Sequence, residues 1–307
     1  MKIENIEIKE KFGERYEKLT DYDEFIKYSK TYLRKSIRIN TLKISIDECR
    51  KKLSKDWILT QIPWLEEGFW IKHKKGRLDI GNTLEHQLGY IYVQEAASMI
   101  PPIVLEPKPG DKVLDMCAAP GSKSSQIGAM MNNKGLLIAN DIGLRINALS
   151  FNLQRCGVSN AIVTAMEGRF FKDKFDKILL DAPCSGTGTI RKSLKTLMSW
   201  NPDMVRRLAG TQRQLISTAF ENLRKNGILV YSTCTLEPEE DEGIVDFLLN
   251  KYKNAKLEEI DVKGLKRSNT ILEFNGEKYN PEINKCLRIW PQDNDTEGFF
   301  VAKIRKV

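Results

Sequence analysis

Short apolar runs and segments with helical periodicity alternate through the last two thirds of this chain. The runs have the composition of strands, and the segments between them have the spacing of amphipathic helices. The strand-like runs cover residues 112–116, 135–140, 161–164, 175–180 and 227–232, and the helical segments cover residues 122–131, 144–156, 203–224 and 237–252. Because parallel strands need long crossover connections, this alternation predicts an α/β fold with a parallel sheet covered on both faces. Residues 287–290 and 299–304 can supply closing strands.

The first third of the chain has a different pattern, which predicts a small α+β module. Aromatic residues and leucine recur at helical spacing within residues 6–32. The further expected elements are strands over residues 36–40, 57–62 and 69–72 and a helix over residues 47–53. A linker helix over residues 94–105, broken by two adjacent prolines, leads to a turn at residues 107–111. We therefore predict two domains, residues 1–106 and residues 107–307.

Charge and cysteine content limit the class of protein. Lys and Arg outnumber Asp and Glu by 49 to 41, which favours a polyanionic partner such as nucleic acid, although an ordinary basic surface has the same balance. The six cysteines are far apart and form no Cys-x-x-Cys pair, so we expect reduced thiols, no disulfide framework and no metal site. The charged start at residues 1–4 and the absence of a long apolar stretch predict a soluble, cytoplasmic protein with no membrane partner.

The candidate ligand site follows from where the predicted strands end. In open parallel sheets, ligands bind beyond the carboxyl ends of the strands. The small residues of the turn at 118–121 allow a ligand to approach the backbone closely, and Asp141 is placed to accept hydrogen bonds from a ribose. This turn lacks the Gly-x-Gly-x-x-Gly spacing of dinucleotide sites, whereas Asp115, Asp141 and Asp181 suit a cationic sulfonium and a ribose. We therefore expect S-adenosylmethionine rather than NAD.

Two of these assignments have an ordinary structural alternative. Gly121 suits any tight turn, so a lone glycine-rich loop is a weak signal for a nucleotide. Asp141 can simply cap the helix that follows it. The cofactor assignment therefore depends on what else gathers at the same strand ends.

Two cysteines supply that further signal. Cys184 lies in the segment 181–188 and Cys234 in the segment 232–235, each just after a predicted parallel strand. Taken singly, either would be assigned to the protein interior, as Cys117 and Cys156 are. Their shared location at two strand ends, beside an aspartate and a cofactor turn, instead suggests covalent catalysis on a base.

Four ordered segments, residues 115–123, 181–188, 232–235 and 297–303, resemble the RsmB/Sun (Nop2/Sun domain) family of RNA cytosine-5 methyltransferases. Residues 38–43 resemble the N-terminal element of that family, so the resemblance covers most of the chain. It implies a Rossmann-like S-adenosylmethionine-dependent methyltransferase domain with a mostly parallel, seven-stranded sheet, preceded by an α+β RNA-binding domain. The implied substrate is a cytosine in tRNA or rRNA.

The resemblance also implies roles for individual residues. The Cys234 thiolate is expected to add to carbon 6 of cytosine so that carbon 5 accepts the methyl group, and Cys184 is expected to assist release. Asp181 is expected to hydrogen-bond at ring nitrogen 3 and to border the cofactor, while Lys123 holds the base or a phosphate and favours the thiolate. Glu167 is expected to reach an adenine edge. The expected cofactor contacts are Cys117, Ala118, Ala119, Pro120, Gly121, Ser122, Lys123, Asp141, Glu167 and Asp181.

Basic residues outside this site are the expected RNA contacts. They are Arg38, Asn40, Lys43, Arg191 and Lys192. A cytosine must leave its stack to expose the ring face, so we expect folded RNA with an accessible cytosine, and one protein chain suffices to bind it. The aromatic residues Trp57, Trp64, Phe69 and Trp70 can stack on bases, but core packing is the simpler expectation.

Three positions depart from the family pattern, and none of them is a thiol. Ser122 stands where glycine is commonest, Glu167 where aspartate is usual, and Gln292 where histidine is frequent. Two other functions stay open. One is a non-catalytic RNA-binding assembly factor, and the other is a methyltransferase acting on a nitrogen of a base or protein, which needs no thiol because the nitrogen supplies its own lone pair.

Overall fold

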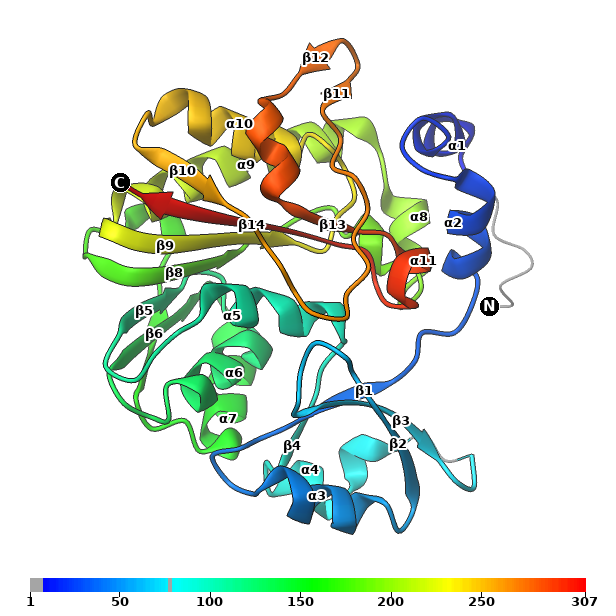
Figure 1. The fold of residues 1–307 in the computed structure, drawn as a ribbon, viewed down its shortest axis with the longest axis vertical. Helices are drawn as coiled ribbons and strands as arrows, with labels where there is room; N and C mark the ends of the chain where they lie inside the picture. The colour runs from blue at the N-terminus through cyan, green and yellow to red at the C-terminus, as the bar shows by residue number, and fades with distance from the viewer. Residues whose placement is uncertain (1–7, 77–78) are drawn as a thin grey trace.

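The computed structural model describes residues 8–76 and 79–307, which form a large lobe built on one sheet and a small lobe beside it (Figure 1). The expectations for the charged start of the chain and for the beginning of the first helix fall on residues 1–7, outside the described residues. Within the described ranges, no helix combines the length and the apolar character that a membrane crossing needs.

The sheet of the large lobe has eight strands in the described part of the chain, one more than expected. Their order is β10-β14-β9-β8-β5-β6-β7, and β13 pairs with β14. The bounds are β5 Lys112–Asp115, β6 Leu136–Asp141, β7 Ala161–Ala165, β8 Phe175–Asp181, β9 Leu223–Thr233, β10 Ala255–Glu258, β13 Leu287–Ile289 and β14 Phe299–Lys306. Strands β5 to β9 are parallel and β14 is antiparallel to both of its main neighbours. The predicted α/β class with a mostly parallel sheet is confirmed.

Helices cover both faces of this sheet, as crossover connections require. Their bounds are α5 Ile100–Leu105, α6 Ser122–Met130, α7 Arg145–Cys156, α8 Lys195–Ser199, α9 Pro202–Glu221, α10 Glu242–Lys251 and α11 Pro291–Asn294. Buried residues of α9 and α10 pack in one apolar core, and those of α5 and α6 pack in a second core on the opposite face. A short hairpin of β11 Glu273–Phe274 and β12 Glu277–Lys278 projects at the edge (Figure 1).

The small lobe is a four-stranded antiparallel sheet with its own core. The strand order is β2-β3-β1-β4, and α3 and α4 cover one face. The bounds are β1 Ser36–Ile39, α3 Ile46–Leu53, β2 Trp57–Gln61, β3 Gly68–His73, α4 Leu84–Gln87 and β4 Ile91–Val93. Trp57 and Phe69 belong to this core, while Trp64 packs in the core between α5 and the large sheet, so core packing is correct for these three aromatic residues. Trp70 is half-buried.

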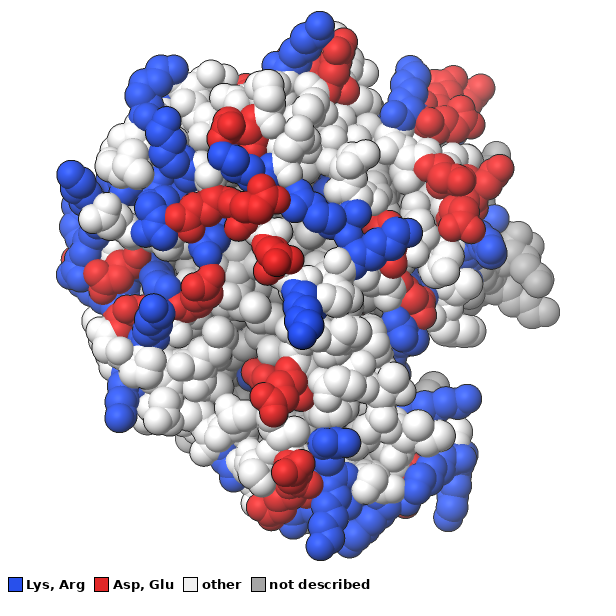
Figure 2. All heavy atoms as spheres, viewed as in Figure 1, with Lys and Arg blue, Asp and Glu red and all other residues white. Residues whose placement is uncertain are grey.

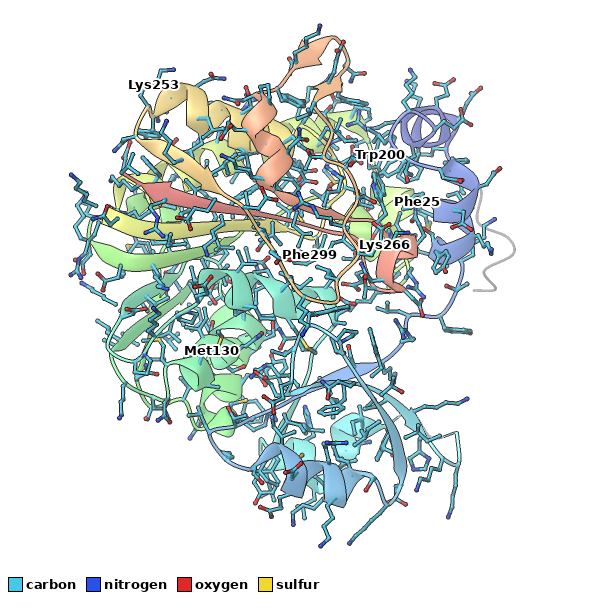
Figure 3. The ribbon with its side chains drawn as sticks, in the orientation of Figure 1. Phe25, Met130, Trp200, Lys253, Lys266 and Phe299 are labelled. Carbon is cyan, nitrogen blue, oxygen red and sulfur yellow. The ribbon has the colours of Figure 1, made fainter. Side chains whose placement is uncertain are left out.

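The first two helices do not belong to the small lobe, which differs from the predicted division at residue 106. Helices α1 Glu10–Tyr16 and α2 Tyr22–Ser29 lie against α8 and α11 of the large lobe (Figure 1). Phe12 packs edge-on against Trp200 at 5.2 Å, and Phe25 packs against Trp290 at 5.7 Å. Figure 3 labels Trp200 and Phe25. Helical periodicity identifies an apolar face but not the surface that will cover it, so the sequence could not assign these helices to a lobe.

Two predicted helices also differ in detail from the observed ones. Pro101 and Pro102 stand at the first turn of α5, where a missing backbone N–H costs nothing, so they open this helix rather than break it. Helix α5 contacts β8 and β9 and therefore belongs to the large lobe. The helix expected over residues 237–252 begins at Glu242, because residues 237–241 form turns.

Candidate active site

The carboxyl ends of β5, β6, β8 and β9 meet at one edge of the sheet, where they surround a cavity of about 700 Å³. Cys117, Asp141, Asp181, Cys184 and Cys234 from these four strand ends line it, together with Glu167, which follows β7. This volume lies in the usual range for sites of small molecules. This cavity thus lies beyond the strand ends, where the sequence predicts the site.

The turn after β5 forms one wall. Gly121 has a φ of +102° at the N-cap of α6, a conformation that favours glycine. Asp141 accepts hydrogen bonds from the backbone N–H of Ala119 and of Ile142, each at 2.8 Å. Because α7 has Leu144 at its N-cap, Asp141 ties the end of β6 to this turn instead of capping a helix.

Not every expected cofactor residue borders the cavity. Cys117, Ala119, Asp141, Glu167 and Asp181 line it, whereas Ala118, Pro120, Gly121, Ser122 and Lys123 are not among its lining residues. Glu167 forms an ion pair with Arg169 at 2.7 Å. Burial raises the pKa of the Cys117 thiol, and nearby aspartates raise it further, so this cysteine stays neutral. 

Asp115 does not face the cavity, although it was expected to surround the cofactor. Its side chain is fully buried and accepts a hydrogen bond from the Ser124 hydroxyl at 2.6 Å. Burial raises its pKa to about 7. Asp115 therefore supports the start of α6 from inside the protein.

Lys123 and Asp181 form a partly buried ion pair beside the two thiols. The Lys123 Nζ atom lies 2.6 Å from Asp181 Oδ2 and 5.4 Å from the centre of the Phe299 ring. Burial alone lowers the pKa of Lys123, but the carboxylate of Asp181 outweighs burial and raises it. The other oxygen of Asp181 accepts a hydrogen bond from the Ser232 hydroxyl at 2.8 Å. The pair therefore fixes a cation near Cys234, with which the ammonium interacts electrostatically.

The two predicted cysteines lie side by side in this cavity. Their Sγ atoms are 3.4 Å apart, and both side chains are half-buried. The hydrogen bond to Cys234, together with burial, raises the pKa of Cys184 well above its usual value. At neutral pH, Cys184 is thus a thiol that can share its proton with the neighbouring sulfur. All six cysteines of the chain are free of disulfides.

Several predicted RNA contacts are not available to RNA in this structure. Arg38 is buried between the lobes and donates hydrogen bonds to Gln94 and Ser125, at 2.9 and 2.8 Å. The amide of Asn40 is buried as well and donates to the carbonyls of Gly89 and Cys156. These two predictions are wrong, because both polar groups satisfy partners across the interface between the lobes.

Arg191 is a third such case. Its side chain is 1% exposed and its guanidinium contacts Asp295 at 2.7 Å and the Tyr32 carbonyl at 3.0 Å. Lys43 is exposed but donates to two backbone carbonyls, and Lys192 is exposed. Of the five predicted contacts, Lys43 and Lys192 are therefore the ones on the surface.

The sequence analysis missed two buried residues of the site, Gln212 and Glu240. Both side chains are fully buried next to the loop that carries Cys184. The acidic run at residues 237–242, directly after the Cys234 segment, was the available signal. Among the described residues, no group of three His, Cys, Asp or Glu side chains is arranged to hold a metal ion.

Comparison with known proteins identifies the family. The profile described as 16S rRNA methyltransferase RsmB/F matches residues 102–305, and the profile of the N-terminal domain of 16S rRNA methyltransferase RsmF matches residues 8–96. The chain belongs to the RsmB/F family of RNA methyltransferases. The predicted family is thus confirmed, and this RsmB/F member is an enzyme of the S-adenosylmethionine-dependent class.

Individual relatives cover this RsmB/F protein to different extents. It is 48% identical to the tRNA (cytosine(49)-C(5))-methyltransferase of Pyrococcus abyssi, over 97% of this chain and 96% of that protein. It is 43% identical to ribosomal RNA small subunit methyltransferase F of Vibrio vulnificus, over 93% of this chain but only 60% of that protein. A crystal structure of a methyltransferase homologue from Pyrococcus horikoshii covers the whole chain with a TM-score of 0.88 and 36% identity.

Proposed function

We propose that this protein transfers a methyl group from S-adenosylmethionine to carbon 5 of a cytosine in RNA, with Cys234 as the nucleophile and Cys184 assisting release. The observation that carries the proposal is the pair of thiols, 3.4 Å apart on one cavity wall beside the Lys123–Asp181 ion pair. A nitrogen methyltransferase needs no such pair, and a non-catalytic binding factor needs neither the pair nor the cavity.

The chemistry explains why two thiols are useful. Carbon 5 of cytosine is a weak nucleophile, so the Cys234 thiolate first forms a bond to carbon 6 and pushes an electron pair toward carbon 5. Carbon 5 then takes the methyl group, which S-adenosylmethionine supplies from its sulfonium. Loss of the proton on carbon 5 to a base returns the electron pair to the ring and expels the Cys234 thiolate.

Because the two sulfurs are so close, the charge on Cys234 controls when Cys184 can act as this base. While Cys234 is an anion, a second negative charge 3.4 Å away is strongly disfavoured, and Cys184 stays protonated. Once Cys234 has bonded to carbon 6, its charge is gone. Cys184 can then release its own proton to solvent more easily, and the resulting thiolate accepts the proton from carbon 5.

The ion pair serves the first step. Adding a thiolate to the ring builds negative charge at nitrogen 3, and the ammonium of Lys123 is a preorganised donor for that charge. Both oxygens of Asp181 already accept hydrogen bonds, from Lys123 and Ser232, so Asp181 positions the lysine instead of donating to the ring itself. This revises the role that Asp181 was expected to have.

The cavity suits the cofactor. Asp141 and Asp181 present carboxylates toward a ribose and a cationic sulfonium, while Met116 and Leu215 supply apolar wall. The turn after β5 has no phosphate-binding pattern, which fits a cofactor without phosphate.

Because Arg38 and Arg191 are buried, we assign RNA binding to the open face of the small-lobe sheet instead. A hollow of about 390 Å³ is lined by Tyr32, Arg34, Ile58, Trp70 and Lys72. Tyr32 is 89% exposed, and the Arg34 guanidinium stacks over Trp70 at 3.7 Å. Exposed aromatic rings and cations together suit unstacked bases and phosphates, and Figure 2 shows Lys and Arg gathered over this lobe.

A tRNA is the proposed substrate, because the relative named for tRNA matches this chain over nearly the full length of both proteins. The RsmB/F profile and the Vibrio vulnificus relative favour 16S rRNA as the second candidate. A single chain acting in the cytoplasm suffices for either reaction. Transfer of a radiolabelled methyl group to tRNA and to 16S rRNA transcripts, followed by bisulfite sequencing, decides between them.

The covalent step is tested by removing each thiol. Cys184→Ala is expected to trap a protein–RNA adduct on denaturing gels, because Cys234 adds to the ring and cannot be released. Cys234→Ala is expected to form no adduct and to transfer no methyl group. Full activity of Cys234→Ala would instead support methylation of a nitrogen, and the opposite adduct pattern would exchange the roles of the two cysteines.

A further inference from the structure

A buried carboxylate lies directly beneath the loop that carries Cys184. Glu240 is fully buried, and its Oε2 atom accepts hydrogen bonds from the backbone N–H of Ser185 at 3.0 Å and from the Gln212 amide at 2.8 Å. Gln212 is fully buried too, on the face of α9 that meets the sheet. The same Gln212 nitrogen donates to the Pro183 carbonyl at 2.9 Å. These two side chains therefore hold the backbone on both sides of Cys184.

The other side of the same loop is tied to the segment that carries Cys234. The Ser185 and Thr235 hydroxyls are 2.7 Å apart, and the Gly188 N–H donates to the Cys234 carbonyl at 3.0 Å. The position of Cys184 is thus set from below by Glu240 and Gln212 and from the side by the Cys234 segment. The result is the 3.4 Å contact between the two sulfurs.

This network lowers the stability of the folded protein, which argues that it has a function. Glu240 Oε1 and Gln212 Oε1 are both buried and have no hydrogen-bond partner in the described residues. A half-satisfied polar network is less stable than an apolar core of the same shape. The network does, however, hold the backbone at Pro183 and Ser185, on both sides of Cys184.

We propose that Glu240 and Gln212 are positioning residues, which hold the Cys184 thiol against the Cys234 sulfur and thereby set the rate at which methylated RNA is released. This inference rests on the proposed function for the release step. The placement of Cys184 itself is independent of that function and can be measured in the free enzyme.

Glutamine is a suitable conservative replacement for Glu240. Burial raises the pKa of Glu240 to about 7, so a large part of the population carries a neutral carboxyl at neutral pH. A glutamine side-chain oxygen in the place of Oε2 still accepts from Ser185 and Gln212, whereas alanine accepts from neither.

The first measurement is adduct formation. Glu240→Ala is expected to accumulate a covalent RNA adduct, as Cys184→Ala does, and to lower kcat by about 10- to 100-fold with little change in KM for RNA. Glu240→Gln is expected to restore release to within about threefold of wild type. Ile244→Ala, a cavity mutation in α10, serves as the control because it lowers stability while leaving the hydrogen bonds of Glu240 and Gln212 in place. 

The second measurement separates this proposal from the proposed function. In the free enzyme, the rate at which iodoacetamide labels Cys184 is measured by peptide mass spectrometry. Glu240→Ala and Gln212→Leu are expected to increase this rate several-fold, whereas Ile244→Ala is expected to leave it unchanged. An unchanged labelling rate in both variants overturns the positioning role. If labelling rises but Cys184→Ala traps no adduct, the placement of Cys184 stands and the covalent mechanism fails.

Discussion

At the residue scale, the Lys123 ammonium is held by its ion pair with Asp181. It is 9% exposed, and Asp181 balances the cost of burying its charge. Removing Asp181 leaves the charge of Lys123 buried and uncompensated, whereas the Asp181 side chain is 28% exposed, so water can solvate its charge when Lys123 is replaced. The role of Lys123 in the addition step can therefore be separated from general stability by a neutral replacement of similar length.

Lys123→Met is expected to lower methyl transfer by about 10²- to 10³-fold, because the donor for charge on the ring is lost. The readout is single-turnover transfer of radiolabelled methyl groups to RNA. Lys112→Met provides the matched control, since Lys112 lies at the amino end of β5 and pairs with Asp173 away from the cavity. Activity of Lys123→Met within threefold of wild type would rule out the proposed role.

At the scale of elements, a set of hydrogen bonds joins the small lobe to the sheet that carries the site. Arg38 on β1 donates to Gln94 after β4 and to Ser125 on α6, the helix that starts at the cofactor turn. Asn40 bridges Gly89 and Cys156, at the end of α7. These contacts explain why Arg38 and Asn40 of the small lobe are buried instead of facing solvent.

Arg38→Met is therefore expected to destabilise the protein by about 2–4 kcal/mol, because Gln94 and Ser125 lose a buried charged donor. Thermal unfolding should show a lower Tm, while the Kd for RNA, measured well below that Tm, stays unchanged. A selective loss of RNA affinity with an unchanged Tm would restore Arg38 as an RNA contact.

At the scale of the whole molecule, we expect the RNA to lie across both lobes. The Arg191 guanidinium joins the chain after the Cys184 segment to the Tyr32 carbonyl at the rim of the small-lobe hollow. A strand held on the open sheet face thus continues toward the thiols. Lys253, on the large lobe, stands far from that path (Figure 3).

Two surface substitutions test this path. Lys72→Gln is expected to reduce the slope of log Kd against log salt by about 0.7–0.9, the contribution of one phosphate contact. Tyr32→Ala is expected to weaken binding by about 1–3 kcal/mol through loss of one stacked base. Lys253→Gln should change neither quantity, and equal effects of Lys72→Gln and Lys253→Gln would indicate nonspecific attraction to a basic protein.

The sequence by itself determined the features that depend on local pattern. The alternation of short apolar runs and helical segments predicted the parallel strands, and the short motifs around Cys184 and Cys234 placed both thiols at strand ends. These features can be predicted from the sequence because periodicity and turn chemistry act over a few neighbouring residues. 

Only the tertiary structure decided which polar groups are buried and which surfaces meet. Arg38 and Arg191 look like RNA contacts in the sequence, but their partners lie far along the chain, at Ser125 and Asp295. The location of α1 and α2 on the large lobe has the same cause, because an amphipathic helix does not encode which surface covers it. The 3.4 Å between the two sulfurs likewise results from β8 and β9 pairing in parallel, a contact between segments about 50 residues apart.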